Sequence, residues 1–189
     1  MLAIHWAIFC IATGLITYIS RGSLHQPRSH GFYRFFAWEI ILVASLRNFP
    51  VWFSHPFSWY QLISWCLLII CCIPVILGTL KLKREGKSLA QGSIPKRQDE
   101  TLFEFEKTTS LVTDGIYHYI RHPLYSSLLL LAWGIFFKRP DLAGLNLALA
   151  ASFFLVATAS LEEQENISYF GSVYQDYMRQ TRRFLPFLF

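Results

Sequence analysis

Long apolar runs alternate with short charged segments along the chain, and their lengths are the first guide to its fold. The first run covers residues 2–19 and contains no Lys, Arg, Asp or Glu. Because about 20 apolar residues cross a bilayer core as a helix, this run predicts a membrane-spanning helix. It lacks the basic start and cleavage site of a signal peptide, so we expect it to remain in the mature protein.

Two further runs in the first half predict a second and a third span. Residues 33–53 are apolar but include Glu39, which should face other helices or water because a carboxylate is costly in lipid. Residues 59–80 form a stronger run, within which Pro74 predicts a kink. The connection through residues 54–58 predicts that these two spans form a helical hairpin.

The second half begins with a polar stretch and ends with two more apolar runs. Residues 81–110 are rich in charge and predict an aqueous loop with short interfacial pieces. Residues 124–137 would extend only about 21 Å as a helix, short of a bilayer core of roughly 30 Å. After a turn, residues 142–161 predict a longer helix, and from Glu162 onward the tail is amphipathic and basic.

Together these runs predict an all-α fold, a polytopic membrane bundle of about five membrane segments. We divide it into residues 1–110, with three spans and a cytoplasmic loop, and residues 111–189, with a terminal helical hairpin and its tail. Small side chains are available for close helix packing in that hairpin. They are Gly144, Ala148, Ala151 and Ser152.

Composition agrees with a membrane protein. Hydrophobic residues make up 53% of the 189 positions and charged residues only 15%, below the roughly 25% of soluble domains. The net charge of +5 does not indicate nucleic-acid binding, because the basic residues lie between apolar runs and so favour a membrane surface. The four cysteines lie inside apolar segments and should be free thiols.

The placement of basic residues predicts the orientation of the bundle. Lys and Arg are concentrated in residues 81–107 and 179–183, which should therefore face the cytoplasm, with Met1 on the opposite side. Only the turn at Lys138 and Arg139 conflicts with this rule.

A candidate site begins where residues 111–122 meet the fourth apolar run. Pro123 disfavours a helical conformation at His122 and suits the first position of a new helix, whose free amides should point back toward Arg121. A helix N-terminus beside a guanidinium suits a carboxylate or a phosphate. The alternative is that Arg121 and His122 only cap the helix and reach toward lipid phosphates.

An acidic pair supplies the opposite charge. Glu162 and Glu163 follow the last apolar run, and in an antiparallel hairpin they would lie beside Arg121 and His122. The alternative is an ordinary solvated helix end that is ion-paired to Arg121. His118 and His122 have the spacing of a zinc pair on a helix, but Pro123 disfavours a helical conformation at His122 and so breaks the register of the pair, and we expect no metal site.

These motifs resemble the isoprenylcysteine carboxyl methyltransferase-like membrane methyltransferases, a family that includes phospholipid- and small-thiol-methylating enzymes. The resemblance covers about residues 111–189. It is carried by Gly115-Ile116-Tyr117, Arg121-His122-Pro123-Leu124-Tyr125, Glu162-Glu163, Phe170-Gly171-Ser172-Val173-Tyr174-Gln175-Asp176-Tyr177 and Pro186.

The resemblance implies that S-adenosylmethionine is the methyl donor, held at the cytoplasmic end of the hairpin and closed in by the C-terminal segment. Such a donor needs both signs of charge and aromatic surface around it. The implied catalytic residues are Arg121 and Glu163. The implied donor-binding residues are Arg121 and His122 for the carboxylate, Glu162 or Glu163 for the ammonium or ribose, and Tyr117 and Tyr125 for packing and hydrogen bonds.

The implied acceptor is lipophilic and enters from the membrane: a prenylcysteine carboxylate, a lipid headgroup or a thiol. Prenylcysteine-methylating members often carry an Arg one turn before the acidic pair, where this chain has residues 157–159 without charge, which counts against a carboxylate. Two other functions stay open. One is a membrane reductase that uses NADPH, since sterol reductase relatives have similar Arg-His-Pro endings, and the other is a scaffold without catalytic activity.

Overall fold

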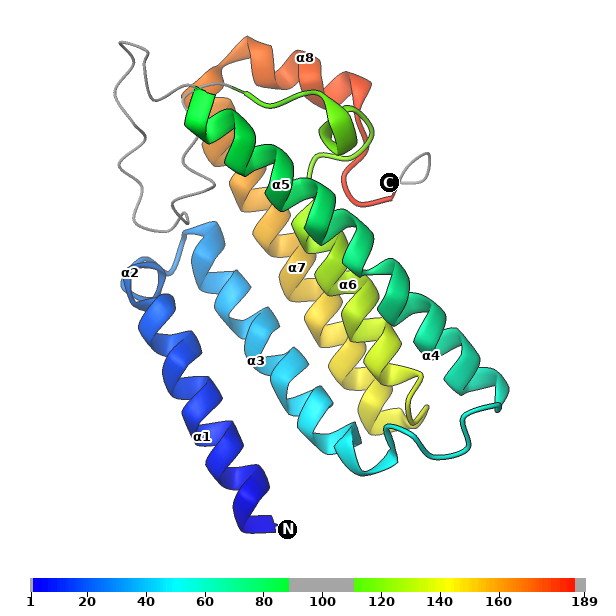
Figure 1. The fold of residues 1–189 in the computed structure, drawn as a ribbon. Helices are drawn as coiled ribbons and strands as arrows, with labels where there is room; N and C mark the ends of the chain where they lie inside the picture. The colour runs from blue at the N-terminus through cyan, green and yellow to red at the C-terminus, as the bar shows by residue number, and fades with distance from the viewer. Residues whose placement is uncertain (1, 89–110, 186–189) are drawn as a thin grey trace.

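Helices form every regular element that the structure, a computed structural model, describes in residues 2–88 and 111–185 (Figure 1). The all-helical prediction is therefore confirmed for these residues, whereas five membrane segments remain a prediction. The long helices run in alternating directions along a common axis (Figure 1). In chain order the elements are α1 (Leu2–Ile19), α2 (Arg21–Leu24), α3 (His30–Asn48), η1 (Phe49–Val51), α4 (Trp59–Ile70), α5 (Cys72–Ser88), η3 (Gly115–His118), α6 (Pro123–Phe136), α7 (Leu142–Phe170) and α8 (Ser172–Gln180).

The core lies where α3, α6 and α7 meet. Helix α7 packs against both α3 and α6, while α4 and α5 cover the other side of α6 and α1 covers α3. Leu155 and Ala159 of α7 are fully buried there against Tyr125 of α6 and Ala37 of α3. Phe184 of the C-terminal segment completes this cluster.

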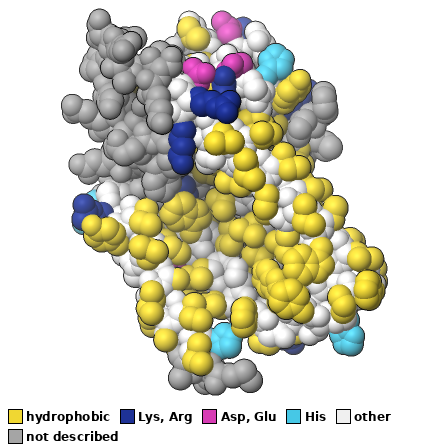
Figure 2. All heavy atoms as spheres, viewed as in Figure 1, with side chains coloured by type: hydrophobic (Ala, Val, Ile, Leu, Met, Phe, Trp, Pro, Cys, Tyr) yellow, Lys and Arg dark blue, Asp and Glu magenta, His cyan; other side chains and the backbone are white. Residues whose placement is uncertain are grey.

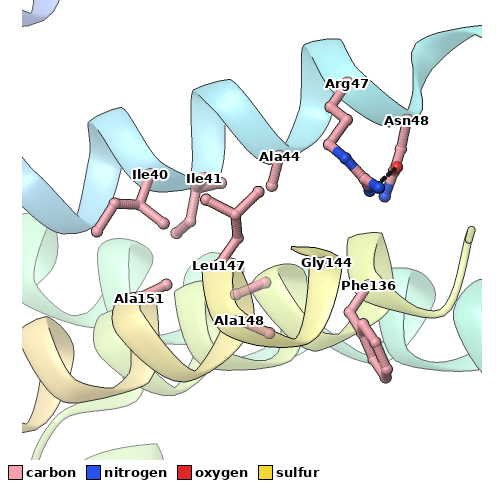
Figure 3. A pocket seen from close by; sticks show the side chains of 11 residues that line it. Ile40, Ile41, Ala44, Arg47, Asn48, Phe136, Gly144, Leu147, Ala148 and Ala151 are labelled. Atoms are coloured by element: carbon pink, nitrogen blue, oxygen red, sulfur yellow. Dashed lines mark hydrogen bonds between the residues drawn. The ribbon is translucent and has the colours of Figure 1, made fainter. Parts of the chain in front are cut away.

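Small side chains on α7 allow α3 to approach closely. Ala148 and Ala151 lie toward Ala44 of α3 (Figure 3). Ser152 instead faces α6, where its hydroxyl oxygen lies 3.2 Å from the indole nitrogen of Trp133. The small residues that we predicted to pack the terminal hairpin are therefore shared between two neighbouring helices.

Two local predictions for the first half agree with the structure. Glu39 turns toward α1, where its Oε2 accepts a 2.8 Å hydrogen bond from the hydroxyl of Thr13. The apolar run containing Pro74 is interrupted at Cys71, a turn residue between α4 and α5. This is where a proline lacking its backbone N–H removes a helical hydrogen bond.

Two helices are longer than we predicted. Helix α5 continues through the basic residues to Ser88 instead of ending at Leu80, and α7 continues to Phe170 instead of ending at Leu161. Lys, Arg, Glu and Gln are good helix formers, so the end of apolar sequence is not the end of a helix. Helix α7 stops only at Gly171, whose φ of +65° favours glycine. Residues 89–110 of the predicted loop and residues 186–189 lie outside the described residues.

Among the described residues, two helical stretches are long and apolar enough to cross a membrane: Trp59–Glu85, which joins α4 to most of α5, and Leu142–Phe170, which is α7. Only 17% and 33% of their most apolar windows are buried, whereas a core helix of a soluble protein would be mostly buried. Hydrophobic side chains accordingly cover the middle and lower part of the face in Figure 2, and charged side chains gather at its upper end. This distribution supports association with a membrane.

Candidate functional site

The segment between η3 and α6 carries Arg121 into the protein beside the acidic pair. Arg121 Nε donates a 2.9 Å hydrogen bond to Glu163 Oε1, and both side chains are less than one-tenth exposed. The chain reaches this position because Pro123 begins α6, so that residues 119–122 form a bend in front of the helix. The structure thus brings the predicted basic motif and the predicted acidic pair together.

A second guanidinium contacts the same carboxylate. Arg183 Nε donates to Glu163 Oε1 at 3.2 Å, its Nη2 donates to Oε2, and its Nη1 lies 3.2 Å from Ser160 Oγ. In the tail that we predicted to be amphipathic and basic, Arg183 and Phe184 turn toward the core. A buried carboxylate needs close positive charge, so Arg183 turns inward, and Phe184 follows it into the core at 6% exposure.

The backbone of the C-terminal segment is hydrogen-bonded to the bend that carries Arg121. Arg121 N donates to Arg182 O at 2.8 Å, and Arg182 N donates to Tyr119 O at 3.0 Å, which forms a short parallel pairing. The Arg121 guanidinium also donates to the carbonyl oxygens of Met178, at 3.1 Å, and Thr181. Arg121 therefore uses its donors largely within the protein.

His122 lies between the two carboxylates without a well-aligned hydrogen bond to either. Its Nδ1 is 3.8 Å from Glu162 Oε2, and its Nε2 is 3.4 Å from Glu163 Oε1. In the described part of the chain, His122 Nε2 and Glu162 Oε2 are buried polar atoms without a hydrogen-bond partner. The imidazole stacks on the ring of Tyr125, with ring centroids 5.4 Å apart.

These groups surround a small cavity of about 40 Å³. Its lining includes five of the six predicted site residues: Tyr117, Arg121, His122, Tyr125 and Glu162. Glu163 is the sixth and holds the two guanidinium groups instead. Sites for small molecules usually measure roughly 300 to 1,000 Å³, so a ligand of that size would require this cavity to widen.

Helix α8 fixes the position of Tyr117. The hydroxyl of Tyr177 donates a 2.6 Å hydrogen bond to the backbone carbonyl of Tyr117. Burial raises the pKa of Tyr177 above its ordinary value, so this hydroxyl keeps its proton and remains a donor at neutral pH. Next to it, Tyr174 is 2% exposed and its pKa is also raised by burial. Both tyrosines belong to the part of the tail that carried the family resemblance.

Sequence reasoning missed a contribution from α3. His30 is 0% exposed, and its Nδ1 lies 2.5 Å from Oε2 of Glu165, one turn beyond the acidic pair. Arg34, also on α3, is 5% exposed and interacts electrostatically with Glu162, as His30 does. His30 and Glu165 are 135 positions apart in the chain, so no local sequence pattern could have indicated their contact.

A larger hollow of about 710 Å³ lies next to this site, between the end of α5 and η3. Its wall combines apolar side chains such as Leu77 and Ile116 with the charged Lys81 and Asp114, whose side chains are 2.6 Å apart. The hydrogen bond from Lys81 lowers the pKa of the exposed Asp114 carboxyl below its ordinary value. None of the predicted site residues lines this hollow among the residues described for it.

Comparisons with known proteins give one family and two relatives. Residues 96–172 match the family described as phospholipid methyltransferase. A methanethiol S-methyltransferase of Crocosphaera subtropica is 31% identical over 96 residues, 49% of this chain and 36% of the relative. Methanethiol S-methyltransferase 2 of Bradyrhizobium diazoefficiens is 34% identical over 80 residues, 42% of this chain and 30% of the relative. The matches thus span about a third of either relative, and no solved structure matches significantly.

Proposed function

We propose that this chain, a distant relative of the phospholipid methyltransferases through residues 96–172, is an integral membrane enzyme that methylates a lipophilic acceptor. The methyl donor is S-adenosylmethionine, which supplies an activated methyl group on a sulfonium. The observation that carries the proposal is the cavity beside Arg121, which is lined by His122 and Glu162. Each of these two residues has a buried polar atom, His122 Nε2 and Glu162 Oε2, without a hydrogen-bond partner in the described part of the chain.

The residues around the cavity fit the chemistry of this donor. Glu162 offers a carboxylate oxygen to an ammonium or to ribose hydroxyls, and His122 offers a donor to a carboxylate. Tyr117 and Tyr125 add aromatic surface, which suits both an adenine ring and a sulfonium cation. Unpaired buried polar groups are uncommon in proteins, and a polar ligand that satisfies them gives a reason for their presence.

We assign different tasks to the two acidic residues. Glu163 accepts hydrogen bonds from Arg121 and Arg183 and is not among the residues that line the cavity, so its task is to hold these guanidinium groups in place. Glu162 lines the cavity, so it faces the donor. Arg121 then acts on the donor mainly through the electrostatic field that it adds beside His122, because its hydrogens are largely used within the protein.

Three features support a lipophilic acceptor that arrives from the membrane. The helices around the site expose large apolar side chains, including Leu77 and Leu80 at the hollow next to η3. The described relatives are named for a small thiol, methanethiol. Residues 157–159 offer no charge to hold an acceptor carboxylate. A thiol or a lipid headgroup therefore fits better than a prenylcysteine carboxylate.

The proposed site faces the cytoplasm, where S-adenosylmethionine is made. The turn at Lys138 and Arg139 lies on the opposite side, where the charge rule predicts few basic residues, but Lys138 is buried inside the protein. Lys138 is 1% exposed, and its ammonium lies 3.4 Å from the ring centroid of Trp65. Arg139 is paired with Asp141 at 3.3 Å. Residues 179–183 and the end of α5 carry more Lys and Arg than this turn, so they decide the orientation.

Binding of S-adenosylhomocysteine, the product of the donor, tests the proposal. We expect the purified protein in detergent to bind it in calorimetry, and Glu162→Gln to weaken binding roughly tenfold or more through loss of a charge-assisted contact. Asp176→Asn is the matched control, since this carboxylate is exposed on α8 and pairs only with Arg179 among the described contacts. Binding of NADPH alone would indicate a reductase, and binding of neither compound would indicate a scaffold.

A further inference from the structure

His30 is a buried histidine with one nitrogen bound and the other unpaired. Glu165 Oε2 lies 2.5 Å from His30 Nδ1, and Glu165 Oε1 accepts a 3.1 Å hydrogen bond from the His30 backbone. His30 Nε2 has no hydrogen-bond partner in the described part of the chain, although it is fully buried. Ser29 caps α3, because its hydroxyl oxygen accepts a 3.3 Å hydrogen bond from Phe32 N, which fixes the start of this helix.

This arrangement selects one form of the imidazole. A carboxylate at Nδ1 holds a proton there, which leaves a lone pair on Nε2 and orients the ring, as in carboxylate–histidine pairs that act as general bases. A histidine that only joined α3 to α7 would gain nothing from an unpaired buried nitrogen, which costs free energy. The unpaired Nε2 therefore indicates a task beyond helix packing.

His30 lies beside the donor site, outside the residues that line the cavity. Its carboxylate partner is Glu165, and the nearby Glu162 lines the cavity with its Oε2 3.8 Å from His122 Nδ1. The widening that a ligand requires would have to reach His30 Nε2. Glu162 and Glu165 are three positions apart on α7 and share one helix face. The charged groups facing His30 are Glu162 and Glu165 from α7 and Arg34 from its own helix.

The balance of these groups suits proton transfer near neutral pH. Burial lowers the pKa of His30, but the hydrogen bond that His30 donates to Glu165 and the charge of Glu162 outweigh burial and raise the pKa above 6.5. A base works best when its pKa lies near the operating pH. A carboxylic acid is already ionised at neutral pH and needs no base, whereas a thiol and an ammonium must each lose a proton before they accept a methyl group. Because the relatives are named for methanethiol, a thiol is the acceptor that we assign to a histidine base.

Resting on the proposed methyltransferase function, we propose that His30 is the general base that deprotonates a lipophilic thiol acceptor, and that Glu165 is its positioning residue. His30 Nε2 takes the proton of the S–H group. The acceptor sulfur forms the new S–CH₃ bond while the methyl–sulfonium bond breaks, and the electrons of that bond remain on the departing thioether sulfur. The proton then passes from His30 to water, so the products are a methyl thioether, S-adenosylhomocysteine and a proton.

The substitution His30→Asn separates this role from a structural one. The Asn side-chain amide replaces Nδ1 and keeps a donor for Glu165, but it has no counterpart of Nε2. For a long-chain alkyl thiol, we expect kcat/KM to fall roughly a hundredfold or more, the usual contribution of a general base. For a lipophilic aromatic thiol that is already ionised at neutral pH, we expect a loss of less than about tenfold, because the thiolate is the nucleophile and needs no base.

A measurement without turnover complements the rates. With S-adenosylhomocysteine bound, the ultraviolet difference spectrum of the wild-type protein should show thiolate when the alkyl thiol is added at neutral pH. His30→Asn should show much less thiolate at saturating thiol. The matched control is His25→Asn, an exposed histidine five positions earlier, which should behave as wild type in both measurements.

The outcomes separate failure of this inference from failure of the proposed function. Equal losses on the alkyl and the ionised thiol, or unchanged thiolate formation in His30→Asn, would overturn the role of His30 while leaving a methyltransferase. Methylation of a lipid amine but of no thiol would overturn the acceptor class. If the wild-type protein neither bound S-adenosylhomocysteine nor methylated any acceptor, the proposed function itself would be wrong.

Discussion

The two ends of the helical bundle both contain buried polar groups, but they satisfy them differently. At the end with the turn between α6 and α7, Lys138 is buried and donates a 3.0 Å hydrogen bond to Gln61 Oε1, while Gln61 Nε2 lies 3.2 Å from Val51 O. Asn48 donates to Ile135 O at 2.7 Å. Buried side-chain atoms of these three residues all have partners in the described part of the chain.

The end that carries the proposed site leaves several such atoms unsatisfied. His30 Nε2, His122 Nε2 and Glu162 Oε2 are buried without hydrogen-bond partners in the described residues, although strong ion pairs surround them. An unpaired buried polar group costs roughly 1 to 3 kcal/mol, so a purely structural cluster would be expected to resemble the Lys138 end. We infer that one end stabilises the bundle and that the other is organised for a ligand.

Breaking the ion cluster at the proposed site should give the largest effect. Glu163→Ala would remove the buried carboxylate that the guanidinium groups of Arg121 and Arg183 share, and would leave the buried Arg121 without its ion-pair partner. Removing one partner of a buried ion pair costs about 3 to 5 kcal/mol, so we expect a large drop in the free energy of unfolding in detergent. Asp176→Ala is the control, because its ion pair with Arg179 is exposed. Equal stability of the two variants would contradict a buried, mutually dependent cluster.

Disrupting the satisfied end should give a smaller effect on stability and none on binding. Lys138→Met keeps much of the side-chain volume but leaves Gln61 Oε1 without its donor and removes the cation from the face of Trp65. We expect about 1 to 3 kcal/mol of destabilisation in the same unfolding assay. Affinity for S-adenosylhomocysteine should stay unchanged in calorimetry. A loss of affinity in the folded variant would show that the two ends are coupled and would weaken the comparison.

A pH titration should give the smallest effect, since it concerns a single proton. The folded-state pKa of His30 is raised by Glu165 against the opposing effect of burial. Its contribution to stability is therefore full below the unfolded pKa of about 6.5 and is lost as pH rises through the higher folded value. Melting temperatures measured from pH 6 to 9 should fall more in the wild-type protein than in His30→Asn. Parallel curves would mean that the pair with Glu165 does not hold a proton preferentially in the folded state.

Local sequence predicted elements whose signals are also local. The uninterrupted apolar run of α1 has the predicted bounds, Leu2–Ile19, and Pro123 occupies the first position of α6 as its fixed φ requires. The predicted end of α7 was wrong because it relied on loss of hydrophobicity. Gly171 gave a better signal for that boundary, since glycine readily adopts the positive φ that ends a helix.

The candidate site was predictable only in part. Five of the six predicted residues line one cavity, because the basic motif and the acidic pair stand at adjoining ends of two neighbouring helices. The assignment of Glu163 to the cofactor could not anticipate Arg183, which lies in a tail whose path depends on its backbone pairing with the bend at Arg121. Nothing in residues 111–189 indicated that α3 contributes His30.

The sequence by itself determined the helical class, the apolar surface and the residues of the motif, because each depends on side-chain chemistry and short-range periodicity. Tertiary structure alone decided which charges neutralise one another and which buried atoms remain unpaired. Those outcomes depend on how α3 lies against α7, two helices that are far apart in the chain. Small side chains line their contact (Figure 3), and small side chains alone do not specify which helix packs against them. Burial makes this pairing important for stability, because a charge that is removed from water costs free energy unless an opposite charge or a hydrogen-bond partner lies next to it.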